Sequence, residues 1–268
     1  MVEKINKFAV IGNPIDHSIS PQIHNLFSNQ QKIKIEYFKI LSDIKNFKND
    51  VISFFQNGGK GLNVTLPFKE LAFEISSNHD ESSLSAMAAN TLVKKNDEIL
   101  SFNTDGLGLI TDLAKKSIVL EGKKILIIGA GGSAKGILRL ISSSNPSSLT
   151  IMNRTEKRAS ALLKKIDTNI ETNLYKNDMS FDLVINTTPI SLLDSSINFP
   201  NNIFNDNSVS YDLYYSKSKT KFQSWSQNSG ASMSYSGIGM LIEQAAVSYN
   251  IWNNFSPDTS GIAKDLGF

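Results

Sequence analysis

The feature that most constrains this chain is a glycine-rich turn near its middle. Residues 123–136 read KKILIIGAGGSAKG, and apolar residues then recur at helical spacing. A strand that breaks into glycines and then into a helix is the local structure that binds dinucleotides. Gly129 permits the tight turn, Gly131 lets the backbone approach a pyrophosphate, and Ala134 permits close packing of the helix on the strand. Because free N–H groups at a helix start attract phosphates, the turn predicts a dinucleotide site.

Roughly 120 residues precede this turn, which is enough for a separate domain. In that stretch strands and helices alternate, and Ser20 is expected to cap the first helix with Pro21 at its first position. The expected strands span residues 7–12, 35–40, 61–66, 91–95 and 98–102, and the expected helices start at residues 20, 44, 67 and 82. The pattern predicts an α/β substrate domain with a mixed sheet.

After the turn, short apolar runs at residues 149–152, 183–186 and 209–213 alternate with helical segments. This spacing predicts a parallel, Rossmann-like sheet. Residues 238–252 form a strongly apolar helical pattern near the end. We therefore expect two domains: residues 1–102, completed by helices in 237–268, bind substrate, and residues 103–236 bind the dinucleotide.

Composition excludes several other classes of protein. With 40% hydrophobic and 19% charged residues in 268, the chain resembles an ordinary globular protein. A net charge of +2 gives no argument for a nucleic-acid partner, and three widely spaced histidines without cysteine give none for a metal site. No apolar run reaches the roughly 18–20 residues of a membrane span, and no signal peptide is visible. We expect a cytoplasmic protein without a membrane partner; the oligomeric state stays open, with a homodimer as one candidate.

The strand after the glycine turn indicates which dinucleotide binds. Residues 152–158, at its end, read MNRTEKR. The Asp or Glu that binds a free ribose 2′-OH is absent, and Glu156 is poorly placed for that role. Arg154 and Arg158 can instead bind a 2′-phosphate, which a carboxylate would repel. The motif favours NADP(H) over NAD(H), and the alternative is that the two arginines form a solvated pair at a helix start.

Further motifs run in order along the chain. Residues 12–25 read GNPIDHSISPQIHN, residues 61–69 read GLNVTLPFK, residues 103–106 read NTDG and residues 239–246 read GMLIEQAA. With the glycine turn and the NRT motif at 153–155, the chain closely resembles the shikimate dehydrogenase family over essentially its whole length. The resemblance implies reversible, NADPH-dependent reduction of 3-dehydroshikimate to shikimate in aromatic amino-acid biosynthesis.

The same resemblance implies that Lys69 and Asp105 form the catalytic pair. Negative charge develops on the carbonyl oxygen as a hydride reaches the carbon, and a cationic proton donor beside that oxygen lowers the barrier. Lys69 can supply the proton, and in the reverse direction it can accept one from the alcohol. Asp105 would hold Lys69 charged and oriented, and would accept a hydrogen bond from a substrate hydroxyl.

The resemblance also implies the residues that bind substrate and cofactor. The substrate carboxylate is expected at Ser18, Ser20, Thr65 and Tyr215, and the ring hydroxyls at Asn90 and Gln244. The cofactor is expected at the glycine turn (Gly129, Ala130, Gly131, Gly132, Ser133 and Ala134), the arginine motif (Asn153, Arg154, Thr155 and Arg158), Thr187, Thr188, Leu213, Gly237 and Met240. A weaker contact is implied at Glu81, for which an exposed acidic residue of a helix is the favoured alternative. His17 and His24 are interpreted as structural or pocket-lining.

The chain departs from the family pattern at several positions. Residues 215–221 read YSKSKTK and lack two usual prolines, so we expect this loop to be more mobile. Lys135 replaces a frequent arginine, and Met87 and Ser191 replace common glycines. These changes bear on cofactor affinity and leave the predicted reaction unchanged.

Two other functions stay open on the sequence alone. One is a quinate/shikimate dehydrogenase that uses NAD(H), against which Arg154 and Arg158 argue. The other is a non-catalytic dinucleotide sensor, in which Lys69 or Asp105 would be expected to be lost. Both residues are present.

Overall fold

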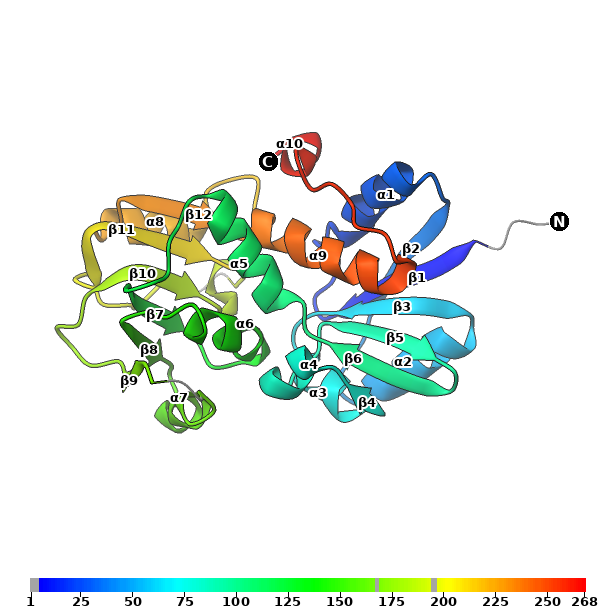
Figure 1. Ribbon diagram of the computed structural model, residues 1–268, viewed down its shortest axis with the longest axis horizontal. Coiled ribbons are helices and arrows are strands. Elements are labelled where there is room, and N and C mark those ends of the chain that lie inside the picture. Colours follow the sequence, from blue (N-terminus) through cyan, green and yellow to red (C-terminus); the bar gives the residue numbers. More distant parts are fainter. Residues whose placement is uncertain (1–4, 167–168, 194–196) are drawn as a thin grey trace.

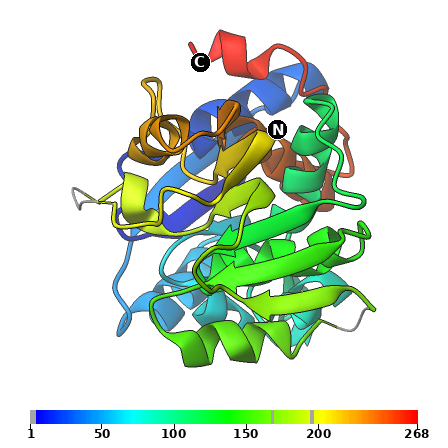
Figure 2. The same ribbon diagram turned by 90° about the vertical axis from the view of Figure 1, so that its left-hand side faces the viewer.

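The computed structural model describes residues 5–166, 169–193 and 197–268. In these residues two six-stranded sheets lie beside each other along the long axis of the molecule (Figure 1). The predicted α/β class is confirmed, with one mixed sheet and one parallel sheet. Seen from the end of the long axis in Figure 2, the second sheet faces the viewer.

The first sheet has the order β2-β1-β3-β5-β6-β4. Its strands are β1 (Asn6–Gly12), β2 (Ile35–Leu41), β3 (Gly59–Val64), β4 (Asn78–His79), β5 (Thr91–Lys95) and β6 (Glu98–Phe102). β5 runs antiparallel to β3 and to β6, and the other pairs are parallel. Side chains alternate across β1 as strand geometry requires: Ala9 and Ile11 pack with α2 (Phe47–Gln56) and α3 (Lys69–Glu74), while Phe8 stacks on Trp252.

The second sheet has the order β12-β11-β10-β7-β8-β9, and all its neighbouring strands are parallel. Its strands are β7 (Lys124–Ile128), β8 (Ser148–Met152), β9 (Glu171–Leu174), β10 (Phe181–Asn186), β11 (Phe204–Asp212) and β12 (Met233–Ser236). From β7 the order runs outward in both directions, so the strand order reverses between β7 and β10. Ligands of open parallel sheets bind at this reversal, beyond the carboxyl ends of the strands.

Two long helices lie between the sheets. α5 (Asp105–Lys115) packs along α9 (Ile238–Asn253), and both cross the middle of the molecule in Figure 1. α9 shares a buried cluster with α1 (Ser20–Gln31) and α10 (Ile262–Asp265). The remaining helical segments are α4 (Glu81–Ala86), α6 (Gly132–Ser142), α7 (Glu156–Leu163), η1 (Pro189–Ser191) and α8 (Lys221–Asn228).

Several predicted boundaries differ from the structure. Ser20 does not cap α1: the cap position is Ile19, and no side chain makes a cap hydrogen bond there. The second helix starts at Phe47 rather than at residue 44, because the Asp43 carboxylate accepts from the N–H groups of Lys45 and Asn46 and fixes a turn first. β4, β9 and β12, all at sheet edges and at most four residues long, were not predicted.

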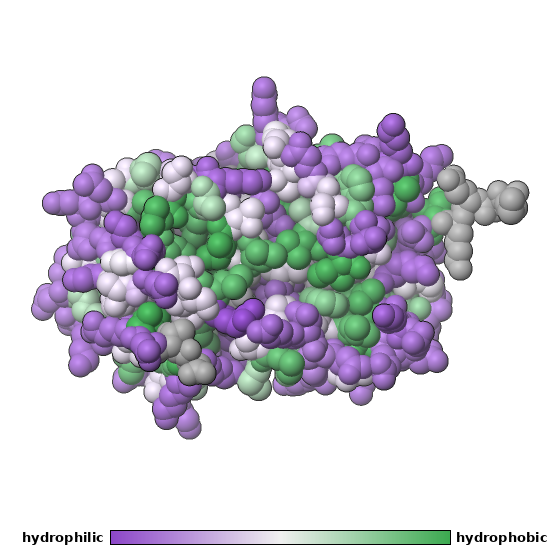
Figure 3. All heavy atoms as spheres, viewed as in Figure 1, coloured by the Kyte–Doolittle hydropathy of each residue, from purple (hydrophilic) through white to green (hydrophobic). Residues whose placement is uncertain are grey.

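The surface of the face drawn in Figure 1 is unevenly polar. Hydrophobic atoms gather in a band across its middle, over α5 and α9, and hydrophilic atoms surround them (Figure 3). Leu107 on α5 is a large hydrophobic residue that is 47% exposed. Among the described residues, no helix is both long enough and apolar enough to cross a membrane.

Candidate functional site

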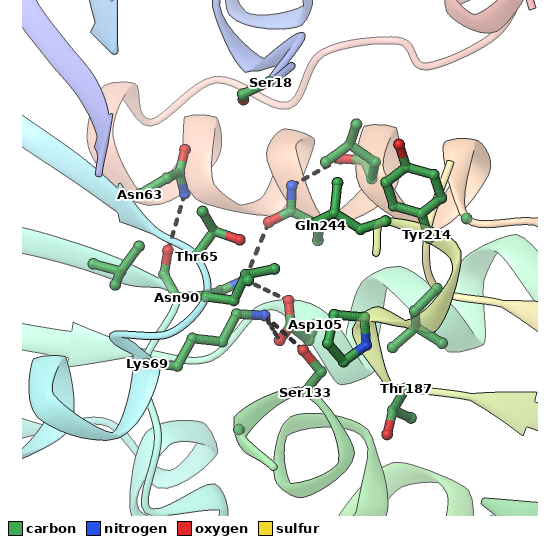
Figure 4. Close-up of a pocket in the computed structure, with 18 of the residues that line it drawn as sticks. Ser18, Asn63, Thr65, Lys69, Asn90, Asp105, Ser133, Thr187, Tyr214 and Gln244 are labelled. Carbon is green, nitrogen blue, oxygen red and sulfur yellow. Dashed lines mark hydrogen bonds and ion pairs between the residues drawn. The ribbon is translucent and has the colours of Figure 1, made fainter. Parts of the chain in front are cut away.

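A cavity of about 430 Å³ lies between the two sheets. It is lined by residues of β1 and β3, of the glycine turn, of the loops that follow β10 and β11, and of α9, and Figure 4 shows it in close-up. All eight residues predicted to bind substrate line it: Ser18, Ser20, Thr65, Lys69, Asn90, Asp105, Tyr215 and Gln244. The fold therefore brings together groups that lie up to 226 residues apart in the sequence, from Ser18 to Gln244.

The predicted catalytic pair forms an ion pair in this cavity. Lys69 Nζ lies 2.5 Å from Asp105 Oδ2, and the two side chains are 13% and 5% exposed. Each stands at the first residue of a helix, Lys69 on α3 and Asp105 on α5, so the helices fix both backbones. Lys69 Nζ is also 3.4 Å from Ser133 Oγ, at the start of α6. The ammonium group thus faces both the substrate side and the glycine turn (Figure 4).

A buried amide network holds the other side of Asp105. Asn90 Nδ2 lies 2.8 Å from Asp105 Oδ1, 2.9 Å from Thr104 Oγ1 and 3.1 Å from Gln244 Oε1, so its two N–H groups are shared among three acceptors. Asn90 Oδ1 accepts from the backbone N–H of Thr104 at 2.9 Å. Each group is buried, so each needs these partners. The network leaves the carboxylate of Asp105 in one orientation.

Asn63 is a site residue that the sequence predictions missed. It lines the cavity from β3, and its Nδ2 donates to the backbone carbonyl of Asn90 at 3.2 Å. The hydroxyl of Tyr37 donates to Asn63 Oδ1 at 2.7 Å. The available signal was an asparagine between apolar residues in a buried strand, since a buried amide requires partners.

The mouth of the cavity joins the two sheets through Tyr215. Its hydroxyl accepts from the backbone N–H of Ile19 at 3.4 Å and lies 3.5 Å from the carbonyl of His17. Burial raises the pKa of Tyr215, so its hydroxyl stays protonated at neutral pH. His17 lines the cavity, and burial followed by the charge of Lys39 lowers its pKa. Hydroxyl groups, including those of Ser18 and Ser20, therefore dominate this end.

His24 lies behind the cavity and does not line it. Its side chain is buried, its ring stacks on Tyr37 with centroids 4.5 Å apart, and neither ring nitrogen has a hydrogen-bond partner among the described residues. Burial lowers its pKa from 6.5 to about 3, so the ring is neutral. His24 thus acts as a structural aromatic residue.

The glycine turn has the shape that a pyrophosphate needs. Gly129 has φ +114°, and a Cβ there would lie 2.3 Å from Thr187 Oγ1, so only glycine fits. A Cβ on Gly132 would meet Cβ of Lys69 at 3.0 Å. Beside Gly131 there is open space, and Gly131 is the cap residue of α6 and has no side chain to cap it, which leaves the first N–H groups of the helix available to an anion. These residues fit a dinucleotide.

Not every residue of the turn faces the cavity. Gly131, Gly132 and Ser133 line it, while Ala130 and Ala134 pack into the hydrophobic core beneath. The burial of Ala134 agrees with its predicted role in packing α6 on β7. Gly129 sits at the reversal of strand order, directly before these residues.

The residues predicted to lie near the nicotinamide line the cavity. Thr187 and Thr188 follow β10, and Leu213 follows β11; Gly237 and Met240 stand at the start of α9, and all five line the cavity. A Cβ on Gly237 would lie 2.2 Å from the carbonyl oxygen of Leu213, so the backbone segments touch here. These contacts hold the start of α9 against the loop after β11.

The residues predicted to bind the adenosine side of the cofactor lie outside this cavity. Asn153, Arg154 and Thr155 follow the carboxyl end of β8, and Arg158 is in the first turn of α7. Both arginines are exposed, and neither guanidinium has a hydrogen-bond or ion-pair partner in the described part of the chain. Glu81 also lies outside the cavity and binds Arg139 at 2.8 Å, with its side chain 78% exposed.

The arrangement is suited to transfer of a hydride with a coupled proton. A partly buried, oriented ammonium group stands between a hydroxyl-lined and amide-lined pocket and a helix start whose N–H groups can bind an anion. A positive charge in this place can stabilise an alkoxide that develops on a substrate in the pocket. Among the described residues, no cluster of side chains could hold a metal ion.

Comparison with known proteins places this chain in a family. Three family models match the chain: "Shikimate dehydrogenase substrate binding domain" over residues 10–92, "Shikimate / quinate 5-dehydrogenase" over 112–211 and "Shikimate 5'-dehydrogenase C-terminal domain" over 237–264. The matched segments hold Lys69 in the first, the glycine turn in the second and Gln244 in the third.

Relatives match over nearly their full length. The chain is 39% identical to shikimate dehydrogenase (NADP(+)) of Colwellia psychrerythraea over 97% of this chain and 96% of that protein. It is 40% identical to the enzyme of the same name from Vibrio campbellii over 99% and 98%. The crystal structure of shikimate 5-dehydrogenase from Thermus thermophilus in complex with NADP(H) and shikimate superposes with a TM-score of 0.86 at 25% identity, over 97% and 98% of the two chains. The chain belongs to the shikimate dehydrogenase family.

Proposed function

We propose that this protein catalyses the reversible, NADPH-dependent reduction of 3-dehydroshikimate to shikimate, a step of aromatic amino-acid biosynthesis. The observation that carries the proposal is the Lys69–Asp105 ion pair, which stands in the cavity with Ser133 of the glycine turn beside it. The relatives at 39% and 40% identity carry this activity in their names.

NADPH, when bound, supplies the hydride that reaches the carbonyl carbon. Lys69 then donates a proton from Nζ to the oxygen, and in the oxidation it accepts that proton back. Asp105 keeps the ammonium group in place through Oδ2, while Asn90 holds Oδ1. Lys69 then regains a proton from water, which replaces the proton that it donated to the substrate.

The substrate carboxylate would lie at the hydroxyl-rich end, at Ser18, Ser20, Thr65 and Tyr215. The ring hydroxyls would meet Asn90, Asp105 and Gln244, whose amide and carboxylate oxygens accept hydrogen bonds. A pocket that binds hydroxyl groups this way discriminates strongly against analogues that lack them, because its own buried groups are left unpaired.

For the cofactor, we propose the pyrophosphate at residues 129–134, the 2′-phosphate at Asn153, Arg154, Thr155 and Arg158, and the nicotinamide near Thr187, Thr188, Leu213, Gly237 and Met240. Two exposed guanidinium groups without partners are suited to bidentate binding of a phosphate. A contact at Glu81 requires its pair with Arg139 to open.

Residues 1–102 with 237–268 would form the substrate domain, and residues 103–236 the cofactor domain. The cluster of α1, α9 and α10 supports this division, since it joins the end of the chain to the start. A cytoplasmic location and a homodimer remain predictions.

The test is a spectrophotometric assay of shikimate oxidation with NADP⁺ and with NAD⁺, followed at the absorbance of the reduced cofactor. We expect turnover with NADP⁺ and a lower kcat/KM with NAD⁺. Equal or better rates with NAD⁺ would reject the cofactor assignment. Binding of NADPH without turnover of 3-dehydroshikimate would reject the enzyme in favour of a dinucleotide sensor.

A further inference from the structure

The loop that carries Tyr215 is held at its two ends: Thr220 Oγ1 donates to Asp212 Oδ2 at 2.7 Å, and the carbonyl of Tyr214 accepts from the N–H of Gly237 at 2.9 Å. It contains no proline between Tyr215 and Lys221, and Lys217 and Ser218 within it are exposed. At its exposed tip, hydrogen bonds join Ser216 and Ser218 at 3.2 Å. These bonds fix the backbone of the loop, and the orientation of the Tyr215 side chain at the cavity depends in addition on the contacts of its ring.

Phe268 supplies an aromatic contact to this loop. Its ring meets the ring of Tyr215 edge-on, with centroids 6.2 Å apart and an angle of 63° between the planes. Tyr214 stacks on Tyr215 at 5.9 Å, so Tyr215 contacts two rings. Lys217 Nζ lies 5.8 Å from the centroid of Phe268, which ties a second loop residue to the same ring. Both geometries are favourable for aromatic and cation–π pairs.

The backbone of Phe268 is itself fixed. Its N–H donates to the carbonyl of Ala263 at 2.9 Å, and the N–H of Gly267 donates to that of Lys264 at 3.0 Å. With Gly267 at φ +78°, these two bonds form the Schellman motif that ends α10. The motif determines the direction in which the Phe268 side chain leaves the helix.

α10 is in turn anchored to the first sheet's side of the molecule. Ile262 is buried in the cluster that contains Ile23 and Phe27 of α1 and Tyr249 of α9. α10 therefore stands beside α1 and above α9, as Figure 1 shows, while Phe268 reaches the loop that leaves the second sheet. Phe268 thus bridges the two sides of the cavity without lining it.

We propose that Phe268 is a positioning residue for substrate binding: it holds Tyr215 beside Ile19 and His17 at the cavity mouth. The inference rests on the proposed function, because it assigns Tyr215 to the substrate carboxylate. Phe268 touches neither Lys69 nor the glycine turn, so it acts on the binding of the substrate and not on the chemical step.

The first test compares Phe268→Ala with the wild type in the shikimate–NADP⁺ assay. Loss of an aromatic pair predicts a rise of about three- to tenfold in the KM for shikimate. The kcat and the KM for NADP⁺ should change by less than about twofold, a split that general destabilisation would not produce. Lys264→Ala, on the exposed side of the same helix, is the matched control and should leave all three constants unchanged.

A double-mutant cycle then shows whether the effect passes through Tyr215. In a Tyr215→Ala background, Phe268→Ala should add no further rise in the KM for shikimate. Independent, multiplying effects would overturn the proposal, as would an unchanged KM in Phe268→Ala alone.

A second variant covers the case in which Phe268→Ala does not fold. Gly267→Ala strains the left-handed residue and brings a Cβ within 3.2 Å of Lys217 Nζ, so it should shift Phe268 and raise the KM for shikimate in the same direction. An unchanged KM in Gly267→Ala would also count against the proposal. If the wild type does not oxidise shikimate at all, the proposed function fails; if it does and the variants match it, only the positioning role fails.

Discussion

The two ends of the candidate site place their charges in opposite environments. Asp105 is buried and held by the amide of Asn90, and Lys69, only 13% exposed, pairs with it, whereas Arg154 and Arg158 are exposed and have no partner among the described residues. A buried charge must be satisfied within the fold, because removing it from water is costly. An exposed charge stays in contact with water and is accessible to a ligand. Under the proposed function, the first region would be organised for catalysis before substrate binds, and the second would attract a phosphate reversibly.

The largest expected effect tests the buried region. Lys69→Ala should lower kcat by at least about 10²-fold, the usual scale for loss of a general acid–base group. The KM for NADP⁺ should change little, because the arginine motif remains. Steady-state kinetics measures both constants, and circular dichroism checks the fold.

Lys60→Ala is the control for Lys69→Ala, since this exposed lysine lies on the neighbouring strand β3. Near-normal kcat in Lys69→Ala would remove Lys69 from the mechanism and would break the contrast between the two regions.

His24 extends the comparison to a buried group that is neutral. The unfolded chain binds a proton at His24 below pH 6.5, but burial lowers the folded pKa to about 3. The contribution of neutral His24 to the free energy of unfolding is therefore complete above pH 6.5 and is lost as the pH falls toward 3. At pH 5 the free energy of unfolding is lower by about 2 kcal/mol. Urea unfolding at several pH values measures this loss.

His24→Phe keeps an aromatic ring without the titration and should flatten the pH dependence of the free energy of unfolding between pH 6.5 and 5. His79→Gln, which leaves His24 in place, is the control. An unchanged slope in His24→Phe would assign the pH dependence to other groups.

The exposed arginines should have an intermediate effect. Replacing Arg154 and Arg158 together with alanine should raise the KM for NADP⁺ by about tenfold or more, through loss of charge-assisted hydrogen bonds. The kcat and the KM for NAD⁺ should stay unchanged, and added salt should shrink the difference between variant and wild type.

Lys157→Ala, which removes a charge between the two arginines, is the matched control. If the double arginine variant binds NADP⁺ as well as the wild type, the 2′-phosphate site lies elsewhere.

The smallest effect is expected at Glu81, whose exposed pair with Arg139 is screened by water. Glu81→Gln should change the KM for NADP⁺ by less than about twofold and the free energy of unfolding by less than about 0.5 kcal/mol. Titration calorimetry with NADP⁺ and thermal unfolding measure these values. A rise of tenfold in KM would show that Glu81 contacts the cofactor directly.

Sequence patterns predicted the parts of the fold that are determined by residues close together in the chain. The strands at residues 91–95 and 98–102 have the predicted bounds, and the long apolar helix extends to Asn253, one residue beyond the prediction. The edge strands β9 and β12 were missed, because four residues carry too little periodicity and their pairing depends on β8 and β11. Ser20 failed as a cap for a different, local reason: the helix already begins at Ser20, and the Ser20 hydroxyl accepts from the Ser18 hydroxyl at 3.2 Å.

By itself the sequence determined the class of the protein. The glycine turn, the arginine motif and the ordered family motifs predicted an α/β dinucleotide enzyme of this family, since backbone conformation at Gly129 and the charge after β8 depend on residues close in the chain. Only the tertiary structure decided how Asn63 supports Asn90, how Phe268 contacts Tyr215, and which charges are buried. Those contacts join residues from distant segments, and burial, which sets the pKa of His24 and the orientation of Lys69, exists only once the two sheets have packed.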